Sequence, residues 1–176
     1  VITADQEGNI LVGAISNSPA DGNKSHPNFG TRYDLWLVKV DGDGNKIWDK
    51  TYGGSGNEFP ESISLLADGS ILIGNRSNSS ADGNKSDPCF GSYDLWLVKV
   101  DGDGNKIWDK TYGGSGMDAD PQVLPASDGG IIIGSRSNSP ADGNKRDPGN
   151  GSYDAWILKV DADGNIEWDR SFGGNE

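Results

Sequence analysis

The sequence predicts an all-β fold made of three repeated sheets, each with four antiparallel strands. The 23 residues from Asp34 to Gly56 recur unchanged from Asp94 to Gly116, and a diverged copy runs from Asp154 to the end of the chain. The 27 glycines and 8 prolines separate short apolar runs, and no stretch keeps the i, i+3, i+4, i+7 spacing of an amphipathic helix. We therefore expect a repeat protein with a period of 60 residues, in which each copy is one supersecondary unit.

Each copy carries two hairpins in the same order, and the second copy shows them most clearly. Its first hairpin turns at Asp68-Gly69, a residue pair that tolerates positive φ. A long polar loop, residues 75–93, precedes the second hairpin, which turns at the glycine-rich residues 102–104. The four expected strands of this copy are residues 61–67 (ESISLLA), 70–74 (SILIG), 94–101 (DLWLVKVD) and 105–112 (NKIWDKTY). One small antiparallel sheet per copy follows from this order.

These strands are apolar on both faces of the expected sheet. A sheet with one wet face alternates apolar and polar residues, whereas Leu95, Trp96 and Leu97 are apolar in succession. Because the chain offers no helix as a cover, we expect other copies of the sheet to cover both faces, as in a β-propeller or a related sheet stack. The more polar fourth strand suits an outer edge, and residues 113–121 are long enough to return the chain to the next inner strand.

The repeat string also resembles a known family. Residues 93–116 (YDLWLVKVDGDGNKIWDKTYGGSG), with the preceding DGS-ILIG hairpin and SADGNK loop, are similar to the tandem repeat of secreted and cell-surface β-propeller proteins of bacteria, notably Bacteroidetes. The third copy departs from this string, and the first has one extra residue before Asp34. The resemblance implies a propeller scaffold, and few members of the family imply a defined activity. The repeat divides the single domain, residues 1–176, into blade 1 (1–56), blade 2 (57–116) and blade 3 (117–176).

Three blades are fewer than the four to eight of an ordinary closed propeller. We therefore expect either a homodimer that completes a six-bladed ring or further blades in a longer chain, since open blade faces would otherwise expose apolar surface. A three-fold β-trefoil or β-prism is the alternative fold, because three four-stranded repeats describe it too. There, Asp43-x-Asn45-x-Ile47 resembles the middle of the Q-x-D-x-N-x-V-x-Y motif of mannose-binding prism lectins, although the flanking Gln and Tyr are absent.

Composition limits the class of partner. The net charge is −12 and the 15 basic residues are scattered, which argues against binding to nucleic acid or to an anionic membrane surface. No apolar run approaches the ~20 residues of a membrane span. The single cysteine, Cys89, cannot form an intrachain disulfide. With only one histidine in the chain, His26, we expect that cysteine to be a free structural thiol.

A repeated acidic turn is a candidate calcium site. Oxygen-bearing side chains stand at positions 1, 3, 5 and 9 of the turn, with a backbone carbonyl available at position 7, which is how a loop collects the oxygens that Ca²⁺ prefers. Position 6 lacks the usual glycine and position 12 lacks a carboxylate, so a β-hairpin closed by Asx-turns is the alternative. The candidate calcium ligands are Asp41, Asp43, Asn45, Asp49, Asp101, Asp103, Asn105, Asp109, Asp161, Asp163, Asn165 and Asp169.

The long loop provides a candidate ligand site. Its shared core, Asn-Ser-x-Ala-Asp-Gly-Asn-Lys, offers side-chain oxygens in every copy, and about sixteen residues without regular structure are long for a connection. A loop fastened by its own Asx-turns or by an ion is the alternative. Tryptophans on the polar outer strand could stack on a sugar, whereas Trp36 and its equivalents are expected in the core. The candidate ligand residues are Asp21, Asn23, Asp82, Asn84, Asp142, Asn144, Trp48, Trp108 and Trp168.

These features together predict a non-enzymatic binding or scaffold module of a secreted or surface bacterial protein, without catalytic residues. A glycan-binding lectin with one site per repeat is the alternative function. An enzyme is the third class. Because the polar residues of the repeat recur in each copy, they would have to form three identical active sites. The catalytic residues of a propeller usually converge from different blades on one centre, so this class is the least favoured.

Overall fold

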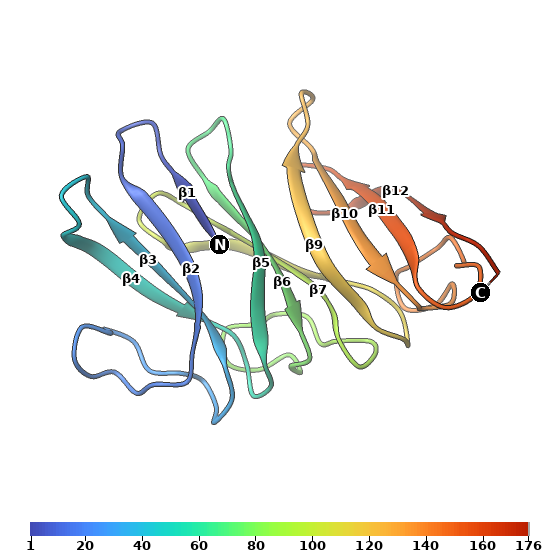
Figure 1. Cartoon of the computed structure of the whole chain (residues 1–176), viewed down its shortest axis with the longest axis horizontal. Coiled ribbons are helices and arrows are strands. Elements are labelled where there is room, and N and C mark those ends of the chain that lie inside the picture. The colour runs from blue at the N-terminus through green and yellow to red at the C-terminus, as the bar shows by residue number, and fades with distance from the viewer. Residues whose placement is uncertain (176) are drawn as a thin grey trace.

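The computed structural model describes residues 1–175, and within that range the chain is all-β, with twelve strands and no helix (Figure 1). The first sheet contains β1 (Ile2–Ala4), β2 (Ile10–Ser16), β3 (Asp34–Val40) and β4 (Lys46–Tyr52). The second contains β5 (Glu58–Leu65), β6 (Ile71–Ser77), β7 (Asp94–Val100) and β8 (Lys106–Tyr112). The third contains β9 (Asp118–Pro125), β10 (Ile131–Ser137), β11 (Asp154–Val160) and β12 (Ile166–Phe172). Each sheet is an antiparallel meander in chain order, which confirms the predicted fold class and the four strands per copy.

Strand β5 begins three residues earlier than the sequence analysis expected. Pairing with β6 already starts at Glu58, and the register shifts between Pro60 and Ser62. A proline has no N–H to donate, so it is tolerated here because β5 is an edge strand of its sheet and carries a bulge at this point. Copy three repeats the shift between Gly134 and Arg136 on the partner strand β10.

The hairpin turns form where the sequence placed them. Gly69 closes the first hairpin of the second copy at φ 81°, and Gly104 closes the second at φ 76°. These left-handed values strain any residue that has a Cβ, which explains the glycine at both positions. The short turns fix the register of each pair, and that register aligns the apolar faces of the three sheets.

The three sheets stack face to face in chain order, so the middle sheet is covered on both sides (Figure 1). All seven residues of β7 are buried. We call the face that points to the next sheet along the chain the forward face, and the opposite one the backward face. The first junction packs the forward face of sheet one (Leu11, Leu35, Leu37, Tyr52) against the backward face of sheet two (Ile71, Ile73, Trp96, Val98, Val100). The second junction packs Leu72, Leu95, Leu97 and Tyr112 against Val123, Ile131, Ile133, Trp156, Leu158 and Val160.

The stack is open, because sheets one and three each keep one uncovered face. On the backward face of sheet one, Trp36 and Val38 are half-buried, whereas their equivalents Trp96 and Val98 are fully buried. On the forward face of sheet three, Phe172 is 58% exposed. An open stack is not the closed three-fold arrangement of a β-trefoil or a β-prism, so the alternative fold is not adopted. No helix in the part of the chain described is long and apolar enough to cross a membrane.

Candidate functional site

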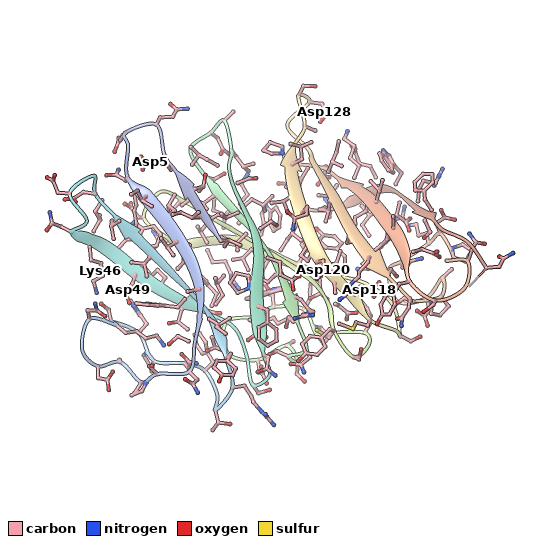
Figure 2. All side chains as sticks on the ribbon, in the orientation of Figure 1. Asp5, Lys46, Asp49, Asp118, Asp120 and Asp128 are labelled. Carbon is pink, nitrogen blue, oxygen red and sulfur yellow. The ribbon has the colours of Figure 1, made fainter. Side chains whose placement is uncertain are left out.

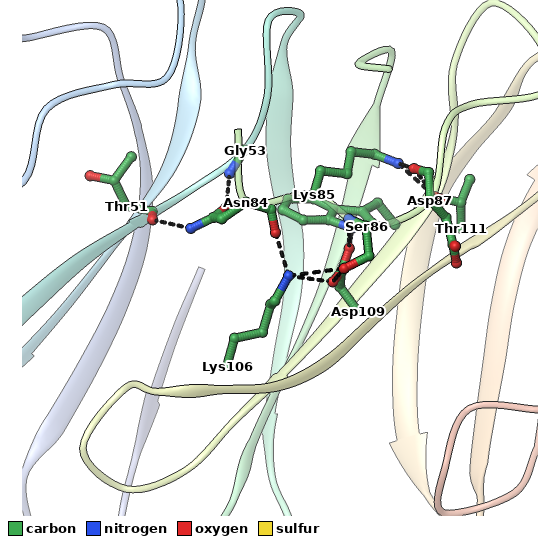
Figure 3. Close-up of polar contacts among 10 residues, drawn as sticks. Thr51, Gly53, Asn84, Lys85, Ser86, Asp87, Lys106, Asp109 and Thr111 are labelled. Carbon is green, nitrogen blue, oxygen red and sulfur yellow. Dashed lines mark hydrogen bonds and ion pairs between the residues drawn. The ribbon is translucent and has the colours of Figure 1, made fainter. Parts of the chain in front are cut away.

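A buried aspartate in the outer strand fastens each long loop to its own sheet. Asp109 accepts hydrogen bonds from Trp96 Nε1 (2.9 Å), the Ser86 backbone N–H (2.7 Å) and Lys106 Nζ (2.5 Å), as Figure 3 shows for the loop and the lysine. Burial alone would raise the pKa of Asp109, but these donors hold it below its ordinary value. The first copy repeats the arrangement around Asp49 (Figure 2 labels Asp49 beside Lys46). The third copy keeps the loop and indole bonds to Asp169 but has Ile166 in place of the lysine.

The long loop of copy two also forms hydrogen bonds with the segment that follows the first sheet. Asn84 accepts a hydrogen bond from the Gly53 N–H (2.9 Å) and donates one to the Thr51 carbonyl (3.0 Å), as drawn in Figure 3. Asp82 Oδ1 accepts from the Ser55 N–H at 2.8 Å. Two further loop residues accept hydrogen bonds from the same segment: Ser79 Oγ from the Gly56 N–H (2.8 Å) and Asn78 Oδ1 from the Asn57 N–H (2.7 Å). We call the four residues Asn78, Ser79, Asp82 and Asn84 the clasp.

The third copy repeats the clasp on the end of the second sheet. Its members are Asn138, Ser139, Asp142 and Asn144, which bond the backbone of residues 113–117 at 2.6–3.0 Å and the Thr111 carbonyl at 2.8 Å. Every one of these bonds goes to a backbone N–H or C=O. The bonds do not depend on the side chains of the bound segment, and Met117 stands where the first junction has Asn57. The glycines of the segment are still required, because a Cβ added at Gly54 or Gly56 would collide with Asp82 or Asn78 of the clasp.

The outer-strand tryptophans close each junction from the other side. Trp48 Nε1 donates to the Gly102 carbonyl (3.1 Å), and Trp108 Nε1 donates to the Ala162 carbonyl (3.2 Å), each in the acidic turn of the next sheet. Six candidate ligand residues thus bind a neighbouring copy of the repeat: Asp82, Asn84, Asp142, Asn144, Trp48 and Trp108. The other three, Asp21, Asn23 and Trp168, are exposed.

The acidic turns are closed by their own hydrogen bonds. Asp41 Oδ1 accepts from the backbone N–H groups of Asp43 (3.0 Å) and Asn45 (2.8 Å), and the Asn45 amide donates to Asp41 Oδ2 (3.0 Å). The turns at Asp101 and Asp161 repeat these bonds. The hydrogen bonds from Asn45 hold the pKa of Asp41 below its ordinary value.

The structure does not bring the fourth candidate calcium ligand of each turn to the other three. Asp49 lies inside strand β4 and is occupied by the loop N–H, the indole and the lysine described above, as is Asp109 in its own copy. Asp169 is occupied by two loop N–H groups and the indole. Among residues 1–175, no group of three or more His, Cys, Asp or Glu is placed to hold a metal ion. The contacts match the Asx-turn alternative, and calcium remains a prediction without geometric support.

A pair of buried carboxyl groups lies beneath each junction. Asp34 and Glu58 are both fully buried and converge on Gly53, where an added Cβ would lie 2.6 Å from Asp34 Oδ1 and 2.5 Å from Glu58 Oε2. Asp94 and Asp118 occupy the same positions at the second junction. Asp34 Oδ1, Asp94 Oδ1 and Asp118 Oδ1 have no hydrogen-bond partner among the described residues.

These carboxyl pairs are arranged to share a proton. Two buried carboxylates in contact cannot both ionise without a large cost in free energy. Burial, reinforced by repulsion from Glu58, raises the pKa of Asp34 to about 7. Burial and repulsion from Asp118 raise the pKa of Asp94 to about 7 in the same way. The other donors around the first pair are N–H and O–H groups, from Phe29, Gly54, Ser77 and Ser79, which suit an anion rather than a metal cation.

Sequence reasoning missed these pairs and the backbone target of the clasp. Glu58 and Asp118 begin β5 and β9, in segments that share no sequence string (NEFP and MDAD) and that the sequence analysis treated as linkers. The available signal was an acid at the same position of both linkers, following an invariant aspartate at the start of the third strand. Cys89 is a free thiol that donates to the Ser77 carbonyl (3.0 Å), and burial raises its pKa to about 11, in line with a structural role.

Comparison with known proteins adds little to this description. No protein-family model matches the chain. The chain is 25% identical over 137 residues, 75% of its length, to the regulatory protein FlaEY of Caulobacter vibrioides, and the match spans 14% of that protein. A crystal structure of a protein of unknown function from Bacteroides caccae aligns with 97% of this chain and 80% of its own, at 10% identity and a TM-score of 0.26. A TM-score this low carries no argument, so the fold rests on the strands of this chain.

Proposed function

We propose that the chain is a non-enzymatic binding and scaffold module, built from propeller-like blades of a secreted or surface protein, whose partner is a further sheet of the same repeat. The proposal rests on how the two faces of the middle sheet are covered. Neighbouring sheets cover both of its apolar faces. The backward face of sheet one and the forward face of sheet three remain open. An apolar face of this kind on a soluble protein typically marks an interaction site.

The two open faces are complementary halves of one junction. Each internal junction joins a forward face to a backward face, and the open pair consists of the forward face of sheet three and the backward face of sheet one. A second copy of the chain can therefore bind head to tail. Such a heterologous contact gives a ring when the rotation closes. Two chains would give six blades, which lies within the range of closed propellers.

Sedimentation equilibrium tests this function. We expect a species of twice the 18.6 kDa of one chain, in a concentration-dependent equilibrium with the monomer. The variant Ile157→Lys places a charge on the open forward face, at the position of buried Leu97, and should abolish the dimer. The matched control is Ile107→Lys, because Ile107 is 54% exposed even in the sheet that is covered on both faces. A protein that stays monomeric up to its solubility limit contradicts the proposal.

Glycan binding is a second candidate, supported by one groove at each junction. The groove at the first junction has a volume of about 470 Å³ and is lined by Phe29, Lys50, Tyr52 and Asn84 among others. An equivalent groove of about 340 Å³ includes Lys110, Tyr112 and Asn144. Both volumes are in the range of small-ligand sites.

A glycan array distinguishes this candidate from the scaffold. Binding that is lost in the double variant Lys50→Ala/Lys110→Ala, with unchanged thermal stability, would favour a lectin with repeated sites. If the unmodified protein gives no signal on the array, the scaffold remains as the single candidate function.

A further inference from the structure

The first long loop carries the same four side chains as the clasp, but within residues 1–175 these side chains bind no other segment. Asn17, Ser18, Asp21 and Asn23 are the equivalents of Asn78, Ser79, Asp82 and Asn84. All four are exposed, and within residues 1–175 their side chains make no hydrogen bond. The equivalent side chains of copies two and three are all bonded to a neighbouring sheet.

The backbone of this empty clasp has the conformation of the filled clasps at its Asp-Gly-Asn-Lys turn. The Lys24 N–H bonds the Asp21 carbonyl at 3.0 Å, as do the equivalent pairs in both filled clasps. Gly22 has φ 56°, compared with 60° and 59° at the equivalent glycines of the filled clasps. Lys24 is buried and Asp49 fastens the following residue, Ser25, so the loop is held by its own sheet. A preformed site loses little conformational freedom on binding, which favours affinity.

The matching backbone segment lies at the other end of the stack, after β12. Gly53, which the clasp of copy two binds, and the adjacent Gly54 are buried, and so are their equivalents at the second junction. Gly173 and Gly174, the equivalents in copy three, are exposed, and so is Asn175. Figure 1 places this segment at the C-terminal edge, far from the first sheet, so the two halves cannot meet within one chain.

We propose that the first long loop is a backbone-binding site for a second copy of this chain, and that its ligand is the segment Ser171–Asn175 of that copy. By analogy with the filled clasps, Asn23 accepts from the Gly173 N–H and donates to the Ser171 carbonyl, and Asp21 accepts from the Asn175 N–H. Trp168, exposed at 39%, then donates to the acidic turn of the first sheet, as Trp48 and Trp108 do at the internal junctions. The inference rests on the proposed head-to-tail association and assigns the residues that set its register.

The test uses the 176-residue chain with Asn23→Ala and Asp21→Ala, because neither side chain supports the fold. Asn23→Ala removes two hydrogen bonds at each new junction, so the dissociation constant of the dimer should rise by about 30-fold or more. The monomer should melt at an unchanged temperature. The matched control, Asn84→Ala, removes the same two bonds inside the chain and should lower the melting temperature.

Hydrogen exchange supplies a second readout. Dimerisation should slow amide exchange at Gly173 and Asn175 in the unmodified protein, and Asn23→Ala should remove that protection. A dimer whose dissociation constant is the same in Asn23→Ala, with Gly173 unprotected, overturns the clasp assignment and leaves the proposed function standing. An unmodified chain that never dimerises overturns both.

Discussion

The buried carboxyl pairs predict that the protein loses stability as pH rises from 5 to 7. The perturbation is pH itself, together with the double variant Asp34→Asn/Asp94→Asn. An asparagine keeps the shape of the protonated aspartate and can still donate to Glu58 or Asp118. The variant therefore mimics the proton-sharing state but cannot lose its proton.

The sign and size follow from the pKa values. Asp34 and Asp94 have a pKa of about 7 in the folded protein and 3.8 as the reference value for the unfolded chain. The folded state therefore holds more protons between these values, and stability is complete below about pH 4 and is lost as pH rises through 7. Each pair contributes a slope of at most about 1.4 kcal/mol per pH unit.

Neighbouring charges do not reverse this sign. Glu58 faces Asp34 and opposes its ionisation, while Lys24 favours ionisation but is itself buried. Asp118 faces Asp94 across the second junction. The aspartates with lowered pKa, such as Asp49, act in the opposite direction, but they lose their contribution only below about pH 4.

Urea unfolding followed by tryptophan fluorescence at pH 5, 6 and 7 measures the effect. The unmodified protein should become less stable across this range, and the double variant should show a shallower dependence. Any contribution from Glu61, whose pKa burial raises, is common to both proteins and cancels in the difference. Equal slopes in the two proteins would refute the shared proton.

Four further outcomes test the description of the fold and the site. Gly113→Ala should cost about 1–3 kcal/mol, because the new Cβ meets the carboxyl pair, with Asp118 Oδ2 at 2.6 Å, whereas Gly42→Ala meets nothing within 4 Å and is the control in the same urea titration. Trp96→Ala should cost about 3–5 kcal/mol in urea unfolding, and a smaller loss is expected at half-buried Trp36. If the acidic turns bind calcium, a chelator lowers the melting temperature and added calcium restores it; the self-bonded turns favour no shift. The half-buried thiol of Cys89, with its raised pKa, should react slowly with an alkylating reagent at pH 8 until the protein is unfolded, as mass spectrometry can follow.

The sequence predicted the sheets well because their signals are local. Unchanged strings marked the copies of the repeat. Residues 95–98 are all apolar, so both faces of their strand had to be covered by other parts of the protein. The stacking of copies followed from the absence of any other cover. The start of β5 was misplaced, because a bulge with a proline does not look like a strand. The end of β6 was misplaced too, because residues 75–77 are polar and were assigned to the long loop, whereas they pair with β7.

The candidate site was harder, because an Asn or Asp side chain has the same chemistry whether it binds an ion, a sugar or a peptide backbone. The loop residues were singled out, but the distance from Asn84 to Gly53 depends on how two sheets stack, which no local pattern records. The calcium motif counted Asp49 as the ninth position of one turn. The strand had already begun at Lys46, so that carboxylate belongs to the loop anchor and not to the turn.

A clasp that bonds only to main-chain groups does not distinguish one copy of the repeat from another. Deleting one whole 60-residue unit, or inserting another, leaves each remaining clasp with an equivalent backbone segment to bind. The length of such an array can therefore change by recombination between near-identical segments without a new clasp having to evolve. The same property makes the unit a natural building block for designed arrays of chosen length.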